Sequence, residues 1–174
     1  ITAIDLTSRF GIAYAYHTPS SKNAKDFLQK IRLFFTGTIA LKMIQTDNGS
    51  EFLKYFDAAC RALGIEHTFS RPKSPKMNAF VERFNETIQI ECLKKTDAVA
   101  PLCWLNEKIR NWLLEYNTYR PHASLDYRTP LDEYIAQLQP ASGDVHTMYV
   151  TRTIASFPLD PPLSVSKISS LLCN

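Results

Sequence analysis

Two carboxylates, Asp47 and Glu82, stand 35 positions apart in the chain. Asp47 follows the apolar run 41–46, which predicts a buried strand. Asn48 and Gly49 then break that strand, because glycine accepts positive φ and asparagine tolerates it. Glu82 falls in the first turns of a predicted helix. Carboxylate oxygens suit Mg²⁺ and Mn²⁺, and paired ions of this kind serve in-line phosphoryl transfer. The spacing favours Asp47 and Glu82 as metal ligands with a catalytic role. The alternatives are that Asp47 only forms the turn after the strand and that Glu82 is an ordinary solvent-exposed acid of the helix.

Four motifs frame these acids in a fixed order. They are I-D-x-x-S-R at 4–9, T-D-N-G-S-E-F at 46–52, V-E-R-F-N at 81–85, and Y-N-x-x-R-P-H-x-S-L at 116–125 with T-P at 129–130. Together they resemble the catalytic core of the retroviral-integrase and insertion-sequence-transposase superfamily, the D-D-E recombinases. The resemblance covers roughly residues 1–135.

The resemblance implies a fold, a reaction and partners. The fold would be α/β, a ribonuclease-H-like mixed sheet flanked by helices. The reaction would be DNA transposition and integration by metal-dependent phosphoryl transfer, with Mg²⁺ (or Mn²⁺) held by the acids. The partners would be the DNA of mobile-element ends and targets, and further copies of the protein. A bacterial-type cytoplasmic location, associated with the nucleoid, would follow.

A D-D-E site needs a third acid, which the sequence does not clearly supply. Asp5 is a candidate, but it lies just before a predicted hairpin turn, and the resemblance implies that the family's first catalytic Asp lies on the preceding strand. The 42 positions from Asp5 to Asp47 are also fewer than the family resemblance implies. We predict that Asp5 forms or caps the turn, that the first strand and its Asp lie upstream of Ile1, and that the sheet has an unpaired edge.

Hydrophobic periodicity supplies the elements that would position these residues. Strands are predicted at 1–5, 10–17, 41–46 and 65–69. Helices are predicted at 22–35, 52–63, 77–95, 101–118 and 131–138. Residues 1–138 would form the catalytic core. Residues 139–174, rich in proline from Pro140 onward, would form a weakly ordered tail with room for one strand at 146–154.

Composition narrows the class of protein. The chain has 174 residues, 45% of them hydrophobic, and a net charge of +3, so it is mildly basic and compatible with DNA binding. No apolar run approaches the roughly 18–20 residues of a membrane span, and no signal peptide opens the chain. Four cysteines without C-x-x-C spacing point to reduced thiols rather than a zinc module.

Basic side chains are the candidates for DNA contact. Arg71, Lys73 and Lys76 lie in a loop interrupted by prolines, and Asn48 lies at the rim of the predicted site. Phosphate contacts of this kind position DNA without reading its sequence. A solvated basic surface is the alternative. Among the other polar residues, Glu51 is interpreted as a helix-start acid, and Arg120 and His122 as packing residues with DNA contact as the alternative.

The function also has alternatives. This chain would be impaired in catalysis if its first acid is missing. It would then be a non-catalytic DNA-binding remnant, or a gene fragment, of a transposase. A ribonuclease-H-like nuclease acting on RNA–DNA hybrids is a weaker option, because the motif at 116–125 argues against it.

Overall fold

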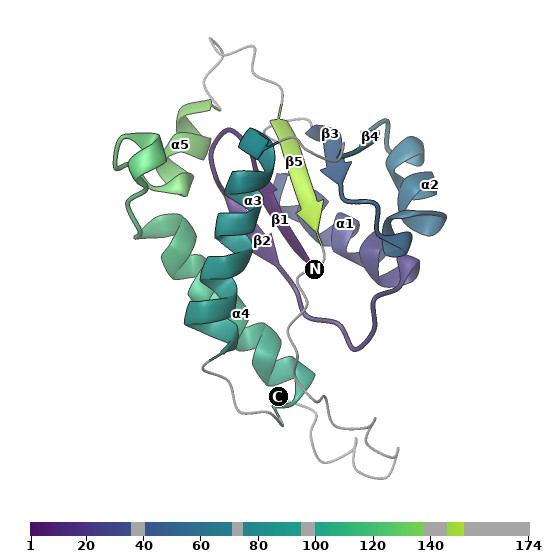
Figure 1. Ribbon diagram of the computed structural model, residues 1–174, viewed down its shortest axis with the longest axis horizontal. Helices are drawn as coiled ribbons and strands as arrows, with labels where there is room; N and C mark the ends of the chain where they lie inside the picture. The colour runs from purple at the N-terminus through teal and green to yellow at the C-terminus, as the bar shows by residue number, and fades with distance from the viewer. Residues whose placement is uncertain (36–40, 71–74, 95–99, 138–145, 152–174) are drawn as a thin grey trace.

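The computed structural model describes residues 1–35, 41–70, 75–94, 100–137 and 146–151. Its centre is one five-stranded sheet with the strand order β2-β1-β5-β3-β4 (Figure 1). The strands are β1 (Thr2–Asp5), β2 (Gly11–Ala13), β3 (Leu41–Thr46), β4 (Glu66–Phe69) and β5 (His146–Thr151). The α/β class and the mixed sheet predicted from the sequence are confirmed.

The strand β5 is the last of the strands that the structure describes, and it lies in the middle of the sheet. It pairs antiparallel with β1, where Thr2 lies opposite Thr151, and parallel with β3, where Thr46 lies opposite Val150. The expected unpaired edge is therefore wrong, because β5 fills that position. The predicted strand in the C-terminal segment is present and belongs to the sheet. The boundary at 138/139 stays a prediction, and residues 138–145 and 152–174 lie outside the described residues.

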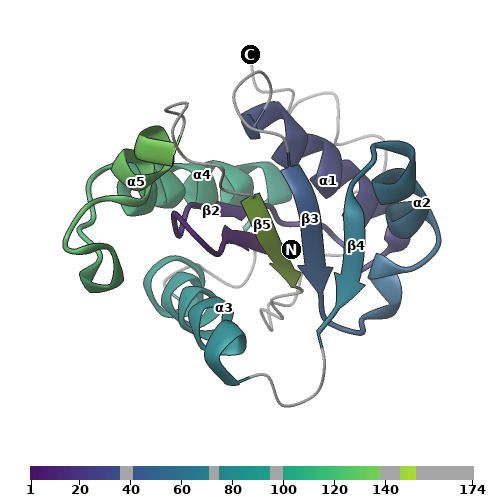
Figure 2. The ribbon, with the colours of Figure 1, turned by 90° about the horizontal axis from the view of Figure 1, so that it is seen from above.

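Helices surround the sheet (Figure 2). They are α1 (Ser21–Phe35), α2 (Tyr55–Ala62), α3 (Pro75–Ile88), α4 (Leu102–Thr118) and α5 (Pro130–Gln137). Short 3₁₀ turns at Ser50–Phe52 and Ala123–Leu125 and a π-helical segment at Gln89–Leu93 complete the order. The predicted helix at 77–95 is thus an α-helix that passes into a π segment.

One face of the sheet is covered by α1 and α2. Phe27 of α1 and Phe56 of α2, together with Phe52 of the 3₁₀ turn before α2, join Met148 and Val150 of β5 in one core cluster. Phe52 and Phe56 meet edge to face at 5.3 Å, which is a favoured geometry for aromatic rings. The two β5 side chains are fully buried, so this strand contributes to the core as well as to the sheet.

The opposite face is covered by α3. Val81 and Phe84 pack there with Ile4 of β1 and Tyr116 of α4. A Cβ placed on Gly11 would lie only 2.5 Å from the Phe84 ring, so glycine at this position of β2 lets the helix approach the sheet. The helix axis is thereby fixed over β1 and β2, and Glu82 is carried on the outer side of α3.

Among the residues described, no helix is both long and apolar enough to cross a lipid bilayer.

Candidate functional site

Asp47 follows β3 at the end where the strand leaves the sheet. Its side chain is half-buried, and the backbone N–H of Gly49 donates a hydrogen bond of 2.9 Å to its Oδ1 atom. Gly49 itself has φ of −63°, so the prediction that this glycine supplies positive φ is wrong. Its missing side chain is what matters, since a Cβ would lie within 2.9 Å of the Asp47 carboxylate.

Glu51 also lies beside Gly49. The same Cβ would lie 2.8 Å from its Oε2 atom, and the residue is only 4% exposed. Glu51 occupies the first turn of the 3₁₀ segment, as expected for a helix-start acid. Its burial was not predicted, and it brings a second carboxylate close to Asp47.

Glu82 lies on the exposed side of α3, while the adjacent Val81 is buried. Phe80, two residues before Glu82, is 37% exposed and lies under the guanidinium of Arg9, 3.5 Å from the ring centroid. In the described part of the chain, no three acidic, histidine or cysteine side chains come together as a metal-binding group. The metal role of Asp47 and Glu82 therefore stays a prediction.

Asp5 has a structural role. It is fully buried at the end of β1, and its Oδ2 accepts hydrogen bonds from the backbone N–H of Ser8 at 2.9 Å and from the Ser8 hydroxyl at 2.5 Å. These bonds close the turn between β1 and β2, as predicted for a turn-forming acid.

Of the four predicted DNA-contacting residues, two lie in the part of the chain that the structure describes. Asn48 is exposed beside Asp47. Lys76 lies in the first turn of α3. Arg71 and Lys73 lie outside the described residues. DNA contact by these four residues stays a prediction.

The motif at 116–125 docks on the core. The Arg120 guanidinium pairs with the Glu91 carboxylate at 2.5 Å, and the Trp112 indole N–H donates to the same carboxylate at 3.0 Å. Tyr116 stacks on Trp112 at 5.0 Å, and His122 meets Tyr116 edge to face at 4.8 Å. Arg120 and His122 thus make the packing contacts expected of them, and their alternative role in DNA contact stays a prediction. The π segment that carries Glu91 forms part of this contact.

Sequence reasoning missed how asparagines hold these elements in place. Asn117 of α4 accepts from the Gly11 N–H at 2.8 Å and donates to the Gly11 carbonyl at 2.9 Å. Asn106 makes the same pair of bonds with Ala15, at 2.8 and 3.2 Å. Asn85 of α3 accepts from the Thr2 hydroxyl at 2.7 Å. The only sequence signal was that Asn85 and Asn117 fall within the motifs.

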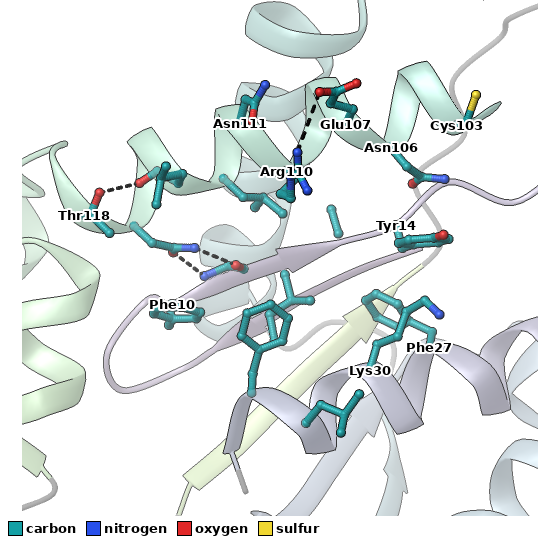
Figure 3. Close-up of a pocket in the computed structure, with 18 of the residues that line it drawn as sticks. Phe10, Tyr14, Phe27, Lys30, Cys103, Asn106, Glu107, Arg110, Asn111 and Thr118 are labelled. Atoms are coloured by element: carbon teal, nitrogen blue, oxygen red, sulfur yellow. Dashed lines mark hydrogen bonds and ion pairs between the residues drawn. The ribbon is translucent and has the colours of Figure 1, made fainter. Parts of the chain in front are cut away.

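A cavity of about 1080 Å³ lies between α1, β2 and α4. Figure 3 shows α4 running along β2, with Asn106 on the side of the helix that faces the strand and with Phe27 and Lys30 across the opening. Neither Asp47 nor Glu82 lines this cavity. The two predicted metal ligands therefore lie apart from this cavity.

Comparison with known proteins agrees with this arrangement. Two family models, each described as an integrase core domain, match residues 1–75 and residues 63–130. The crystal structure of the catalytic core domain of BIV integrase superposes with a TM-score of 0.61 at 20% identity, covering 78% of this chain and 84% of that one. The ribonuclease-H-like fold predicted from the sequence is thus confirmed.

Two curated relatives come from bacterial insertion elements. A protein of insertion element IS476 from Xanthomonas euvesicatoria is 37% identical over 84 residues, which are 48% of this chain and 24% of the relative. A transposase of element IS904 from Lactococcus lactis is 29% identical over 91 residues, covering 52% and 36% respectively. The chain thus spans about a quarter to a third of the length of these relatives. Together, the two family matches, these relatives and the fold support an integrase or transposase catalytic core.

Proposed function

We propose that this chain is a core segment of a DNA transposase or integrase, an enzyme that moves DNA by phosphoryl transfer. The observation that carries the proposal is Asp47, a half-buried carboxylate at the C-terminal end of a parallel strand in an integrase core fold. Open α/β sheets place their reactive groups at such strand ends. Binding of mobile-element and target DNA, assembly of several copies and a nucleoid location belong to the same proposal.

Asp47 and Glu82 would hold a divalent cation, Mg²⁺ or Mn²⁺. Mg²⁺ binds proteins through one or two carboxylates and keeps several of its waters, so a half-buried Asp47 and an exposed Glu82 suit one ion. When bound, such an ion supplies positive charge beside a phosphodiester oxygen. The chain's own part is to orient the ligands: the Gly49 N–H holds one oxygen of Asp47, and α3 presents Glu82.

A second ion would need a further ligand besides Asp47 and Glu82, and a β5 strand without acids favours a second candidate function. Of the two strands beside β3, β5 is the one that also pairs with β1, and its six residues (His146–Thr151) include no Asp or Glu. With Asp47 and Glu82 as its two assigned ligands, the site would bind DNA without cutting it efficiently. We therefore propose that catalysis by this polypeptide is impaired, with the non-catalytic DNA-binding remnant as the alternative.

The test restores a carboxylate in β5. Thr46 lies opposite Val150, so an Asp at position 151 would stand in register with Asp47. We expect the wild-type chain to nick supercoiled plasmid weakly with Mn²⁺, and the Thr151→Asp variant to nick at least about tenfold faster, because one added charge contact in a catalytic site is worth that much or more. Adding Asp47→Asn or Glu82→Gln to Thr151→Asp should abolish the gain.

The controls separate the two candidates. Asp5→Asn in the Thr151→Asp background should leave nicking measurable, since Asp5 serves the turn. DNA binding is measured in parallel by fluorescence anisotropy at two salt concentrations, because phosphate contacts weaken as salt rises. Binding without nicking in every variant would establish the remnant. Nicking that survives Asp47→Asn would refute the assigned site.

A further inference from the structure

A buried histidine lies on β4, immediately behind the strand end that carries Asp47. The His67 side chain is only 1% exposed, and both of its ring nitrogens have partners. Nδ1 lies 3.0 Å from Oδ1 of Asp57 on α2, and Nε2 lies 3.0 Å from Oγ1 of Thr46 at the end of β3. Asp57 is held in turn by Arg61 at 2.8 Å.

The direction of these bonds follows from the groups involved. A carboxylate only accepts, so Nδ1–H donates to Asp57, and in the neutral ring Nε2 accepts from the Thr46 hydroxyl. Thr46 is fully buried, and a buried polar group that loses its partner is costly. The Asp57–His67–Thr46 chain therefore ties α2 and β4 to the last residue of β3.

Two backbone contacts extend this chain of bonds to the site. The Thr46 carbonyl accepts from the Ser70 N–H at 2.7 Å, which holds the end of β3 against the end of β4. Asp47 is the next residue, and the Gly49 N–H then holds its carboxylate. The end of β3 is thus held by two contacts of Thr46, one from its hydroxyl to His67 and one from its carbonyl to Ser70. The orientation of Asp47 depends on this strand end.

We propose that His67 is a positioning residue for Asp47, acting through Thr46 and held in place by Asp57. This inference rests on the proposed function, since it assigns Asp47 to a divalent cation. A residue with a purely structural role would stabilise the fold without changing how tightly that cation binds. We expect His67 to stabilise the fold and also to strengthen cation binding. The reason is that Thr46, its hydrogen-bond partner, immediately precedes the proposed ligand Asp47 in the chain.

The test compares Mn²⁺ affinity with stability in a matched set of variants. Thr46→Val keeps the shape of the side chain and removes the hydroxyl, whereas Thr46→Ser keeps the hydroxyl. We expect Thr46→Val and His67→Ala each to raise the Mn²⁺ dissociation constant about tenfold, the lower end of the effect of removing groups that orient a metal ligand. Thr46→Ser should stay within about twofold of wild type, since the hydrogen bond is retained. Electron paramagnetic resonance of free Mn²⁺ gives the constant.

A second readout needs no metal. Amide hydrogen exchange at Ser70 and Gly49 reports the order of the strand end, and we expect faster exchange in Thr46→Val and in His67→Ala. The control is Tyr16→Phe, which removes a side-chain hydrogen bond of 2.7 Å to Asp26 that involves neither β3 nor β4. It should lower stability and leave both the Mn²⁺ constant and these two amides unchanged.

The outcomes distinguish the two proposals. If Asp47→Asn abolishes Mn²⁺ binding while Thr46→Val binds as tightly as wild type, the positioning role of His67 is wrong and the metal site stands. If Asp47→Asn binds Mn²⁺ as wild type does, the metal site is wrong and the inference fails with it. Because Thr46 and His67 share one hydrogen bond, the double variant should weaken binding no more than either single change.

Discussion

Asp5, Asp47, Glu51 and Glu82 show how strongly one chemical group depends on its surroundings. Asp5 is fully buried and bound by Ser8, while Glu82 on α3 faces solvent. Asp47 lies between these extremes, since it is half-buried and the Gly49 N–H donates to its Oδ1 atom. A carboxylate that keeps contact with water can exchange ligands, whereas one enclosed in a turn cannot. Residue environment, more than residue type, therefore favours Asp47 over Asp5 as the proposed metal ligand.

Gly11 provides a prediction at this scale. An added Cβ would lie 2.5 Å from the Phe84 ring and 3.3 Å from the Tyr116 ring, so Gly11→Ala must displace α3 from β2. We expect a loss of about 1–3 kcal/mol in the free energy of unfolding, measured by urea denaturation. Gly64→Asn is the control, since Gly64 has φ of +67° with no atom within 4 Å and asparagine accepts that backbone. Equal losses in both variants would contradict the steric explanation.

His122 provides a second prediction. Burial lowers its pKa below the ordinary 6.5, and the charge of Arg120 acts in the same direction. The folded protein therefore keeps this ring neutral at a pH where the unfolded chain takes up a proton, so stability is full above about pH 6.5 and falls as the pH decreases below it. The free energy of unfolding should fall more steeply from pH 7 to pH 5.5 in wild type than in His122→Gln. Parallel pH profiles would show that His122 does not contribute.

At the scale of elements, local periodicity predicted most of what the structure contains. The predicted strand at 41–46 and the helices at 22–35 and 101–118 agree with β3, α1 and α4 to within one residue. The same reasoning could not place β5, because periodicity shows that a strand exists but not which strands it pairs with. It also could not find the burial of Glu51 or the His67 contacts, since both depend on how a turn and a helix fold back on β3.

The contact between α4 and β2 leads to a prediction for one element. Asn106 and Asn117 satisfy the backbone groups of Ala15 and Gly11, which would otherwise be unpaired at the edge of the sheet. Changing either asparagine to alanine should cost about 1–3 kcal/mol, because the backbone groups lose their partners. The two positions are eleven residues apart, roughly 16 Å along the helix, so the two losses should add.

Urea denaturation of the single and double variants measures this sum. Asn111→Ala is the matched control, since Asn111 is an exposed asparagine on the same helix and its removal should change stability by no more than about 0.5 kcal/mol. Light scattering would also detect association through the uncovered edge of β2 in the double variant. A cost for Asn111→Ala equal to that for Asn117→Ala would show that the helix, and not the contact with β2, is what the substitutions disturb.

For the whole molecule, β5 decides whether the sheet is one unit. It joins the antiparallel pair β1–β2 to the parallel pair β3–β4, and within the described residues no other strand links them. The core cluster beneath α1 and α2 crosses the same junction, since it includes Ile12 of β2, Ile44 of β3 and Val150 of β5. The two halves of the fold, and with them Asp47 and the helix that carries Glu82, are therefore held in place by β5, which follows all the other described elements in the chain.

Val150→Asp tests this dependence. Val150 is fully buried, and an unpaired charge there should cost about 4 kcal/mol or more, enough to unfold much of a domain of ordinary stability. Leu33→Asp introduces the same charge at an apolar residue of α1 that is 76% exposed, and it should change stability by no more than about 0.5 kcal/mol. Circular dichroism in the near ultraviolet and urea denaturation measure both variants. A Val150→Asp protein as stable as wild type would mean that β1–β2 and β3–β4 hold together without β5, and the sheet order would have to be revised.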